Sequence, residues 1–318
     1  MSQAEVRKGR YKMGRLEKKN TLIAYSFLAP NFIGFAVFTL IPVICAVALS
    51  LFEWGGGDIS RLKFVGLDNY ATIFAAKEVA EKGIGYFFGR ADLGIALKNT
   101  AFYTVVTVPL TIVCALALAM LLNKIRGAVF FRTVFFFPYV SSMVAICVCW
   151  SFMLMRNGPV NQFIMALGID FNKGWTADST MAIWSIILVS VWRNMGYYMV
   201  LYLAALQGIP RELTEAATVD GANKWQQFLH VTLPQLKPTT FFVSVMMVIS
   251  CFKIYDVVAI MTEGGPGRAT KMLVTYIYDE AFVKNRYGQA SAISMVLLVI
   301  VLAITIIQFS SEKKFSND

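Results

Sequence analysis

Six long apolar stretches constrain the fold of this chain more than any other feature of its sequence. Each is long enough to cross the hydrocarbon core of a bilayer, which is about 30 Å thick and needs about 20 residues of helix. Because lipid offers no hydrogen-bond partners to the backbone, spans of this kind form helices. The sequence therefore predicts an all-α membrane protein with six transmembrane helices, at residues 31–51, 101–122, 133–155, 180–205, 239–260 and 290–310.

Composition agrees with a membrane protein and argues against other classes. Apolar residues make up 57% of the 318 residues, charged residues make up 15%, and the mean hydropathy is +0.61, well outside the soluble range. The formal net charge of +10 is explained by basic residues around the spans, and no basic stripe with interleaved aromatics points to nucleic acid. The cysteines are predicted to be buried free thiols, because all lie inside apolar stretches: Cys45, Cys114, Cys147, Cys149 and Cys251.

The distribution of Lys and Arg predicts the orientation. These residues are in excess in the arm 1–20, the turn 123–132, the segment 210–238 and the tail 311–318, whereas the other loops are nearly balanced. The positive-inside rule therefore places both termini in the cytoplasm. We predict a basic cytoplasmic arm at 1–20, lying on the anionic leaflet, a transmembrane domain at 21–310 and a cytoplasmic tail at 311–318. The arm is too long and too charged for a cleaved signal peptide.

The polar segment 210–238 is predicted to form a helix, a tight turn and a second helix just outside the bilayer. Pro210 suits a first helical turn, where its missing N–H costs nothing. Asp220 and Gly221 then break the helix, because Gly permits a left-handed backbone and Asp can cap the next helix. Pro234 is expected to end that second helix, whose apolar face carries Trp225, Phe228 and Leu229. A loop that merely connects two spans is the alternative.

Three elements of this segment resemble the EAA loop of membrane subunits in binding-protein-dependent ABC importers: Glu215-Ala216-Ala217, Asp220-Gly221-Ala222 and Leu233-Pro234. In that family the loop forms coupling helices that dock into a groove on the ATP-hydrolysing subunit. The resemblance implies a type I importer permease fold with a coupling loop at 207–238. The residues implied to contact the ATPase are Glu215, Ala216, Ala217, Asp220, Gly221 and Ala222.

A second resemblance lies on the opposite predicted face. The segment 261–271 would be a flexible turn on its residues alone, and no phosphate-binding G-x-x-x-x-G-K-[ST] pattern fits it. However, Thr262-Glu263-Gly264-Gly265-Pro266, followed by Tyr276-Ile277-Tyr278 and Ala281-Phe282, resembles the T-x-G-G-P…Y-I-Y…A-F signature of carbohydrate importer permeases, with Glu263 in place of the usual Gly. The same family carries patterns similar to Gly66–Phe74, Asn99-Thr100 and Arg286–Ala292.

Charged and amide residues inside the fourth and fifth stretches are candidates for a polar translocation path. Arg193 near mid-membrane costs about 2.5–3.5 kcal/mol on insertion scales, so it should face the bundle interior or a wet cavity. Lys253 and Asp256 are three residues apart, so we expect them on one helical face, where they neutralise each other or a partner helix. The predicted path residues are Arg193, Asn194, Tyr197, Lys253, Tyr255 and Asp256. Contacts between subunits are the alternative role for this set.

Together the resemblances imply the permease subunit of an ABC importer for a sugar or oligosaccharide. The chain is not expected to be an enzyme, since it has no Walker A sequence and its single histidine, His230, has no catalytic or metal partners and is expected at a helix C-terminus.

The expected partners are a related permease (a heterodimer, with a homodimer as the alternative), two ATP-binding subunits that hold ATP and Mg, a sugar-binding protein and membrane lipid. No cofactor or metal is expected on this chain itself. The expected location is a bacterial-type cytoplasmic membrane. An ion-coupled secondary transporter and a non-transporting membrane protein are the rival functions.

Overall fold

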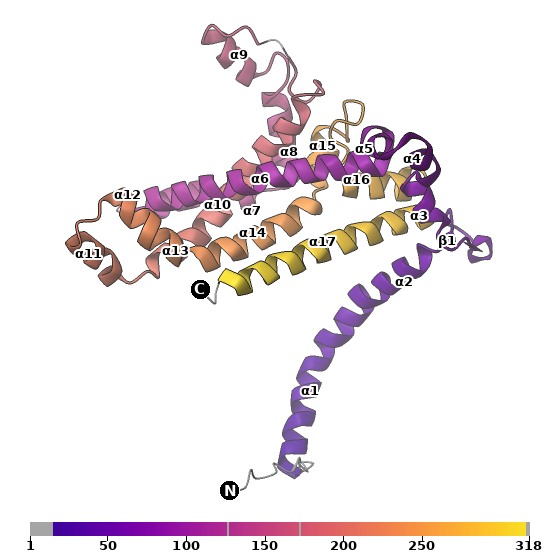
Figure 1. The fold of residues 1–318 in the computed structure, drawn as a ribbon, viewed down its shortest axis with the longest axis horizontal. Helices are drawn as coiled ribbons and strands as arrows, with labels where there is room; N and C mark the ends of the chain where they lie inside the picture. The colour runs from indigo at the N-terminus through magenta and orange to yellow at the C-terminus, as the bar shows by residue number, and fades with distance from the viewer. Residues whose placement is uncertain (1–14, 126, 172, 316–318) are drawn as a thin grey trace. The chain divides into compact units, whose positions relative to one another are not determined.

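The computed structural model describes residues 15–125, 127–171 and 173–315, and most of them are helical (Figure 1). Most of the predicted arm 1–20 and the last three residues of the tail lie outside the described residues. The chain divides into two compact units, Met1–Ala48 and Leu49–Asp318. The predicted boundaries at 20/21 and 310/311 both fall inside helices and stay predictions.

The first unit is one long apolar helical stretch. It comprises α1 (Arg15–Phe35), the π-helical turn η1 (Ala36–Leu40) and most of α2 (Ile41–Leu49). Residues Ile23–Leu49 have a hydropathy of 2.6 and meet the length for a membrane span, and the described chain buries none of that window. Pro42 has no N–H to donate to the carbonyl four residues earlier. Just before it, the N–H of Ile41 donates to the Ala36 carbonyl, five residues earlier, which is a π turn.

Four long helices lie side by side in the second unit: α6 (Asp92–Asn123), α10 (Ala182–Gln207), α14 (Lys237–Phe252) and α17 (Tyr287–Phe315) (Figure 1). Small residues allow close approach where lipid gives no hydrophobic drive for association. Ala115 and Ala119 of α6 are fully buried. At Gly196 of α10 the backbone approaches Phe135 so closely that an added Cβ would lie 1.8 Å from its carbonyl oxygen. Small residues therefore allow close packing of α6 in the bundle and of α10 against α7 (Val129–Val140).

The third and fifth predicted spans are not straight helices. α7 (Val129–Val140) and α8 (Met143–Met153) are bent by 96° at Ser141-Ser142, and the stretch Lys224–Gln235 is bent by 64° against α14. α14 stops at Phe252, and α15 (Asp256–Met261) begins after a three-residue break. In the described residues, four helical stretches are by themselves long and apolar enough to span a membrane: Ile23–Leu49, Asp92–Asn123, Ala182–Gln207 and Tyr287–Glu312. The number is up to six if each bent pair counts as one span.

Shorter elements connect the bundle. The first and second spans are joined by β1 (Phe52–Glu53), η2 (Ile59–Arg61), β2 (Lys63–Phe64), α3 (Asp68–Ile73), α4 (Ala76–Lys82) and α5 (Ile84–Arg90). β1 pairs antiparallel with β2, so that Phe52 lies opposite Phe64 and Glu53 opposite Lys63. α16 (Leu273–Tyr278) and η4 (Asp279–Val283) precede α17, and α9 (Pro159–Ala166) lies between α8 and α10.

The α9 segment has its own small polar centre. The fully buried Asn161 donates to the carbonyls of Arg156 (2.9 Å) and Lys173 (2.7 Å) and accepts from Trp175 Nε1 at 2.7 Å. Hydrogen bonds from Thr180 and the ion pair with Lys173 hold the pKa of Asp178 well below its ordinary value. The Asn161 contacts therefore join α9 to the residues just before and just after it.

The cysteines are only partly as predicted. All five lie among the described residues as free thiols, but only Cys147 and Cys251 are buried. Cys114 is half-buried, and Cys45 and Cys149 are exposed on the outer surface of their helices. The expected burial is therefore wrong for Cys45 and Cys149, because an apolar span also has a face that the chain itself does not cover.

Candidate functional site

The predicted coupling segment forms two short helices joined by a left-handed turn. α11 (Arg211–Val219) follows Pro210, and Gly221 has φ +82° as the break requires. The second helix is built from α12 (Lys224–Gln227), the π turn η3 (Phe228–Thr232) and α13 (Leu233–Gln235). The predicted helix–turn–helix is therefore present, although three of its details differ.

The first difference is the cap. Asn223, not Asp220, caps the second helix: its Oδ1 accepts from the N–H groups of Trp225 (3.0 Å) and Gln226 (2.9 Å). The Gln226 side chain accepts in return from the Asn223 N–H at 2.8 Å. This reciprocal pair is a capping box, which requires Gln or Glu three residues after the cap. Asp220 lies too early in the chain to form it.

The other two differences concern Pro234 and His230. Pro234 does not end the helix, because the π turn before it lets Leu233 N–H donate to the Phe228 carbonyl and the helix continues to Gln235. His230 lies inside that π turn and not at a C-terminus, with Nδ1 3.1 Å from the Gln226 carbonyl oxygen. The π turn thus accommodates a proline that would otherwise stop the helix.

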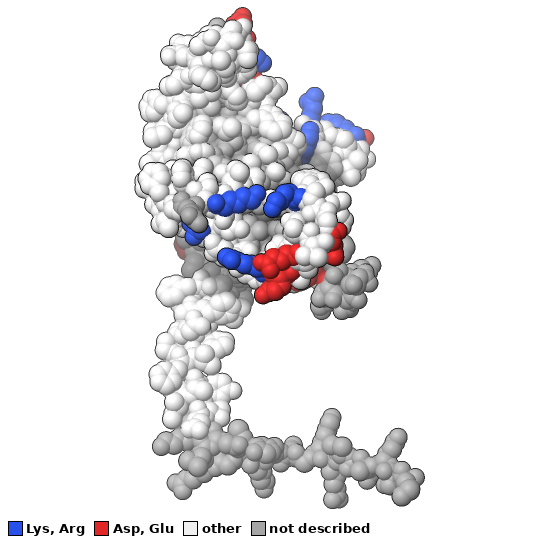
Figure 2. Space-filling view, turned by 90° about the vertical axis from the view of Figure 1, so that its left-hand side faces the viewer, with Lys and Arg blue, Asp and Glu red and all other residues white. Residues whose placement is uncertain are grey.

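Four of the six predicted ATPase-contacting residues line one hollow. A cavity of about 290 Å³ is lined by Ala217, Asp220, Gly221 and Ala222 together with residues of α12 and η3. Glu215 and Ala216 lie outside the hollow on the exposed surface of α11. At the tip of α11, Val219 is 88% exposed. Figure 2 looks at this end of the second unit and shows a group of acidic side chains beside separate basic ones.

A second hollow is lined by residues of α6, α7, α8, α10, α14 and α15, and we call it the inner cavity. Its volume is about 240 Å³. Five of the predicted path residues line it, namely Arg193, Asn194, Lys253, Tyr255 and Asp256. They come from two different places, α10 and the break between α14 and α15. The cavity therefore brings both charge signs and an amide together.

Arg193 is held by a residue of the bent third span. Its Nη2 donates to the Tyr139 carbonyl at 3.0 Å, and the guanidinium carbon lies 5.0 Å from the Tyr139 ring centroid. Tyr139 also lines the inner cavity. Tyr197, the sixth predicted path residue, does not line this cavity; its ring stacks on the Tyr139 ring, with the centroids 4.4 Å apart. Tyr198 lines the wall instead, because consecutive helical residues point in different directions.

The prediction that Lys253 and Asp256 lie on one helical face is wrong. The helix ends at Phe252, so Lys253 and Asp256 lie on either side of a break and not on one helical face. Among the described residues, no salt bridge joins them. Asp256 instead begins α15, where its negative charge suits the helix N-terminus. Polar groups at such a break can serve a cavity, since irregular backbone at membrane depth occurs where it lines one.

Sequence reasoning missed several aromatic and hydroxyl residues of the inner cavity. These are Tyr103, Ser190, Tyr198 and Ser250. A single Tyr or Ser inside an apolar run carries no pattern that separates a cavity wall from ordinary packing. Only the assembled bundle places them together.

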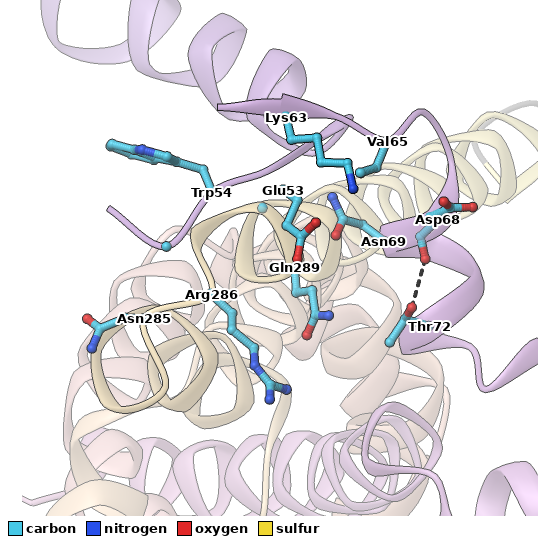
Figure 3. Close-up of a pocket in the computed structure, with 12 residues that line it drawn as sticks. Glu53, Trp54, Lys63, Val65, Asp68, Asn69, Thr72, Asn285, Arg286 and Gln289 are labelled. Atoms are coloured by element: carbon cyan, nitrogen blue, oxygen red, sulfur yellow. Dashed lines mark hydrogen bonds between the residues drawn. The ribbon is translucent and has the colours of Figure 1, made fainter. Parts of the chain in front are cut away.

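A third hollow, the outer cavity, lies beside β1 and α3, at the end of the second unit opposite α11 (Figure 1), and Figure 3 shows it in close-up. It has a volume of about 490 Å³ and is lined by residues of β1, β2, α3 and the start of α17. In Figure 3, Glu53, Lys63, Asn69 and Gln289 turn toward one another, and Trp54 lies at the edge. The cavity therefore offers amides and both charge signs beside an indole ring.

Two of the sequence motifs meet at this outer cavity. Asn69, from the motif Gly66–Phe74, is 5% exposed and donates to the carbonyls of Ser50 and Phe52, both at 2.9 Å. Gly288, from the motif Arg286–Ala292, packs so closely that an added Cβ would lie 2.0 Å from the Phe52 carbonyl oxygen. The two motifs thus hold the same β-strand against the start of α17.

The segment 261–271 is ordered by specific contacts, so its interpretation as a flexible turn is wrong. Asn99 donates from Nδ2 to the carbonyls of Arg268 (3.0 Å) and Lys271 (3.1 Å). Arg268 and Lys271 both form ion pairs with Asp92, at 3.0 and 3.1 Å. Thr270 Oγ1 donates within the loop to the Gly265 carbonyl at 2.7 Å. The Asn99-Thr100 motif and the glycine-rich motif are therefore two halves of one structure.

Residues 108–317 match the model of a protein family described as the binding-protein-dependent transport system inner membrane component. That match covers more than half of the chain. The chain belongs to this family. It is a membrane-embedded permease with several spans, and the fold is that of a type I ABC importer permease.

Individual relatives agree with this assignment. The probable ABC transporter permease protein YurN of Bacillus subtilis (strain 168) is 38% identical over 91% of this chain and 96% of its own length. The lactose transport system permease protein LacF of Rhizobium radiobacter is 35% identical over 91% of this chain and 93% of its own length. A crystal structure of a bacterial ABC transporter involved in alginate import superposes with a TM-score of 0.78 at 22% identity, covering 95% of this chain and 99% of that one.

Proposed function

We propose that this chain is the membrane subunit through which an ABC importer moves a sugar or oligosaccharide into the cytoplasm. The observation that carries the proposal is the inner cavity, in which Arg193, Asn194 and Asp256 converge beside tyrosine rings. Amides and charges bind hydroxyl groups, and aromatic rings cover the C–H faces of a sugar. The similarity to LacF, which is named as a lactose transport permease, supports the same substrate class.

ATP hydrolysis belongs, in this proposal, to two partner subunits that dock on the coupling segment. The exposed Val219 and the hollow beside Gly221 give such a partner an apolar anchor and a receiving surface. A second, related permease is the expected neighbour of this chain in the membrane. A sugar-binding protein would deliver the substrate from outside. Both termini would lie on the cytoplasmic side of a bacterial-type membrane.

Co-purification tests this function against its rivals. The chain is expressed with its native neighbours, extracted in a mild detergent and probed for a bound ATPase, whose activity should rise with the sugar-loaded binding protein. An ion-coupled transporter would show uptake that follows an ion gradient without any bound ATPase. A complex with neither ATPase nor uptake would indicate a non-transporting membrane protein.

The inner cavity gives a quantitative prediction. We expect Asn194→Ala to lower uptake efficiency about fivefold and Asp256→Ala about tenfold or more, because a neutral hydrogen bond is worth about 1 kcal/mol and a charged one about 1.5–3 kcal/mol. Uptake kinetics in proteoliposomes measure the effect. Asn157→Ala and Asp170→Ala, both exposed and away from the cavity, are the matched controls. Unchanged uptake kinetics in both cavity variants would mean that Asn194 and Asp256 contribute to packing and not to the path of the sugar.

A further inference from the structure

Five aromatic side chains form a continuous row between the outer and inner cavities. Ring centroids are 5.4 Å apart for Trp54 and Tyr287, 6.4 Å for Tyr287 and Phe282, and 5.1 Å for both Phe282–Tyr278 and Tyr278–Tyr255. Trp54 lines the outer cavity and Tyr255 lines the inner cavity. The row therefore begins in one polar hollow and ends in another.

The middle of this row is exposed. Phe282 is 64% and Tyr278 is 42% exposed, while the other three rings are half-buried. Tyr276, from the same sequence motif, is only 6% exposed and packs in the core. The motif thus places one aromatic residue inside the protein and two on its surface, where residues four apart lie on one helical face. Core packing does not explain the exposed pair.

The rings are held at fixed positions by backbone contacts. Tyr287 N–H donates to the Trp54 carbonyl at 3.0 Å, and an added Cβ on Gly56 would lie 2.8 Å from the Tyr287 ring. Arg286 N–H donates to the Glu280 carbonyl at 2.7 Å, which closes the turn between η4 and α17. This turn brings Phe282 against Tyr287. The row is therefore a built feature of the fold.

We propose that this aromatic row is a track along which the sugar passes from the outer cavity to the inner cavity. The inference rests on the proposed function, that a sugar is what the chain moves. Each ring offers a flat apolar face to the C–H side of a sugar ring, while the hydroxyl groups remain free for water. Such contacts are weak and tolerant of orientation, so the sugar moves from one ring to the next. The amides and charges at either end bind its hydroxyls more specifically.

Two other roles for exposed rings define the test. Tyr and Trp collect at membrane interfaces, and aromatic residues are also common in contacts with partner proteins. A tyrosine at the membrane interface depends on its hydroxyl group, which a phenylalanine lacks, and a contact of Phe282 with lipid or with a partner depends mainly on apolar area, which a leucine also supplies. A sugar track depends on a flat ring. Replacing Phe282 by Leu, Ala and Trp separates these possibilities, and Phe163→Ala is the matched control, since Phe163 of α9 is 67% exposed and lies outside the row.

The experiment uses the whole transporter in proteoliposomes, with the binding protein and the ATPases. Uptake of lactose, maltotriose and arabinotriose is measured, and the sugar that the wild-type complex takes up best serves as the probe. We expect Phe282→Ala and Phe282→Leu to lower its uptake about tenfold, whereas Phe282→Trp and Phe163→Ala stay close to wild type. Tyr278→Phe should retain uptake and Tyr278→Leu should lose it, which repeats the test at a second position.

The outcomes are separable. Wild-type uptake with equal uptake by Phe282→Leu and Tyr278→Leu would overturn the track and leave the proposed function standing. A wild-type complex that hydrolyses ATP but takes up none of the three sugars would overturn the substrate class, and the track with it. Ring-dependent uptake at both positions supports the track.

Discussion

Gly221→Val is expected to abolish sugar uptake while leaving the protein inserted in the membrane. Gly221 has φ +82°, and nothing lies within 4 Å of an added Cβ, so backbone strain and not space limits this position. A left-handed conformation costs an L-residue about 1–2 kcal/mol, and more for a β-branched one. The turn relieves that strain by opening, which moves α11 relative to α12.

The consequence is large because the turn fixes the geometry of the coupling segment. Ala222 N–H donates to the Ala217 carbonyl at 2.9 Å and Gly221 N–H donates to the Thr218 carbonyl at 3.1 Å. Both bonds depend on the left-handed residue. When they open, the hollow beside Gly221 loses its shape, and a docked ATPase can no longer transmit its motion to the spans.

A graded series checks the cause. Asn tolerates the left-handed region better than Ala, and Ala better than Val, so uptake should fall in that order. Gly168→Val is the matched control, since Gly168 has the same φ of +82° and equal free space but lies outside the coupling segment. Uptake and ATPase stimulation by the binding protein are measured together. Normal transport by Gly221→Val would mean that the segment only connects two spans.

The sequence predicted the helices and the coupling turn because both depend on local signals. Apolar length specifies a span, and a glycine at a helix break specifies the left-handed turn at Gly221. The break after Phe252 was not predicted, because the stretch 239–260 is long and apolar enough for one continuous span. Where a helix stops inside such a stretch is decided by packing against the other helices.

The candidate site likewise contains some residues that the sequence identifies and others that it does not. Arg193 was expected to face the interior because a lone charge in lipid is unstable, and the structure agrees. Tyr139, whose carbonyl holds Arg193, carries no such signal in the sequence. The placement of Lys253 and Asp256 on one helical face was wrong because the assumed helix does not continue through those residues. Long-range contacts such as Asn99 with Arg268 are likewise invisible to periodicity.

Gly196→Ala is expected to have the largest effect on stability. The added Cβ would lie 1.8 Å from the Phe135 carbonyl oxygen and 2.6 Å from its carbonyl carbon. These atoms belong to the backbone of α7, so no side chain can rotate away, and α7 must move from α10. Overpacking of this kind costs about 1–3 kcal/mol. The midpoint of thermal unfolding should therefore be lowered by about 4 °C.

The same substitution should also impair transport, because α7 carries the residue that holds Arg193. Tyr139 accepts the Arg193 hydrogen bond through its carbonyl, one helical turn beyond Phe135, so a shift of α7 withdraws that acceptor from the inner cavity. Gly89→Ala is the control: it lies in α5 with nothing within 4 Å of an added Cβ, and alanine favours a helix. Thermal unfolding in detergent and uptake in proteoliposomes measure the two effects.

An unchanged midpoint for Gly196→Ala would show that the two helices are further apart than the structure places them. Because the obstructing atoms are backbone, truncating the Phe135 side chain should not restore either property, which separates a backbone contact from ordinary side-chain crowding.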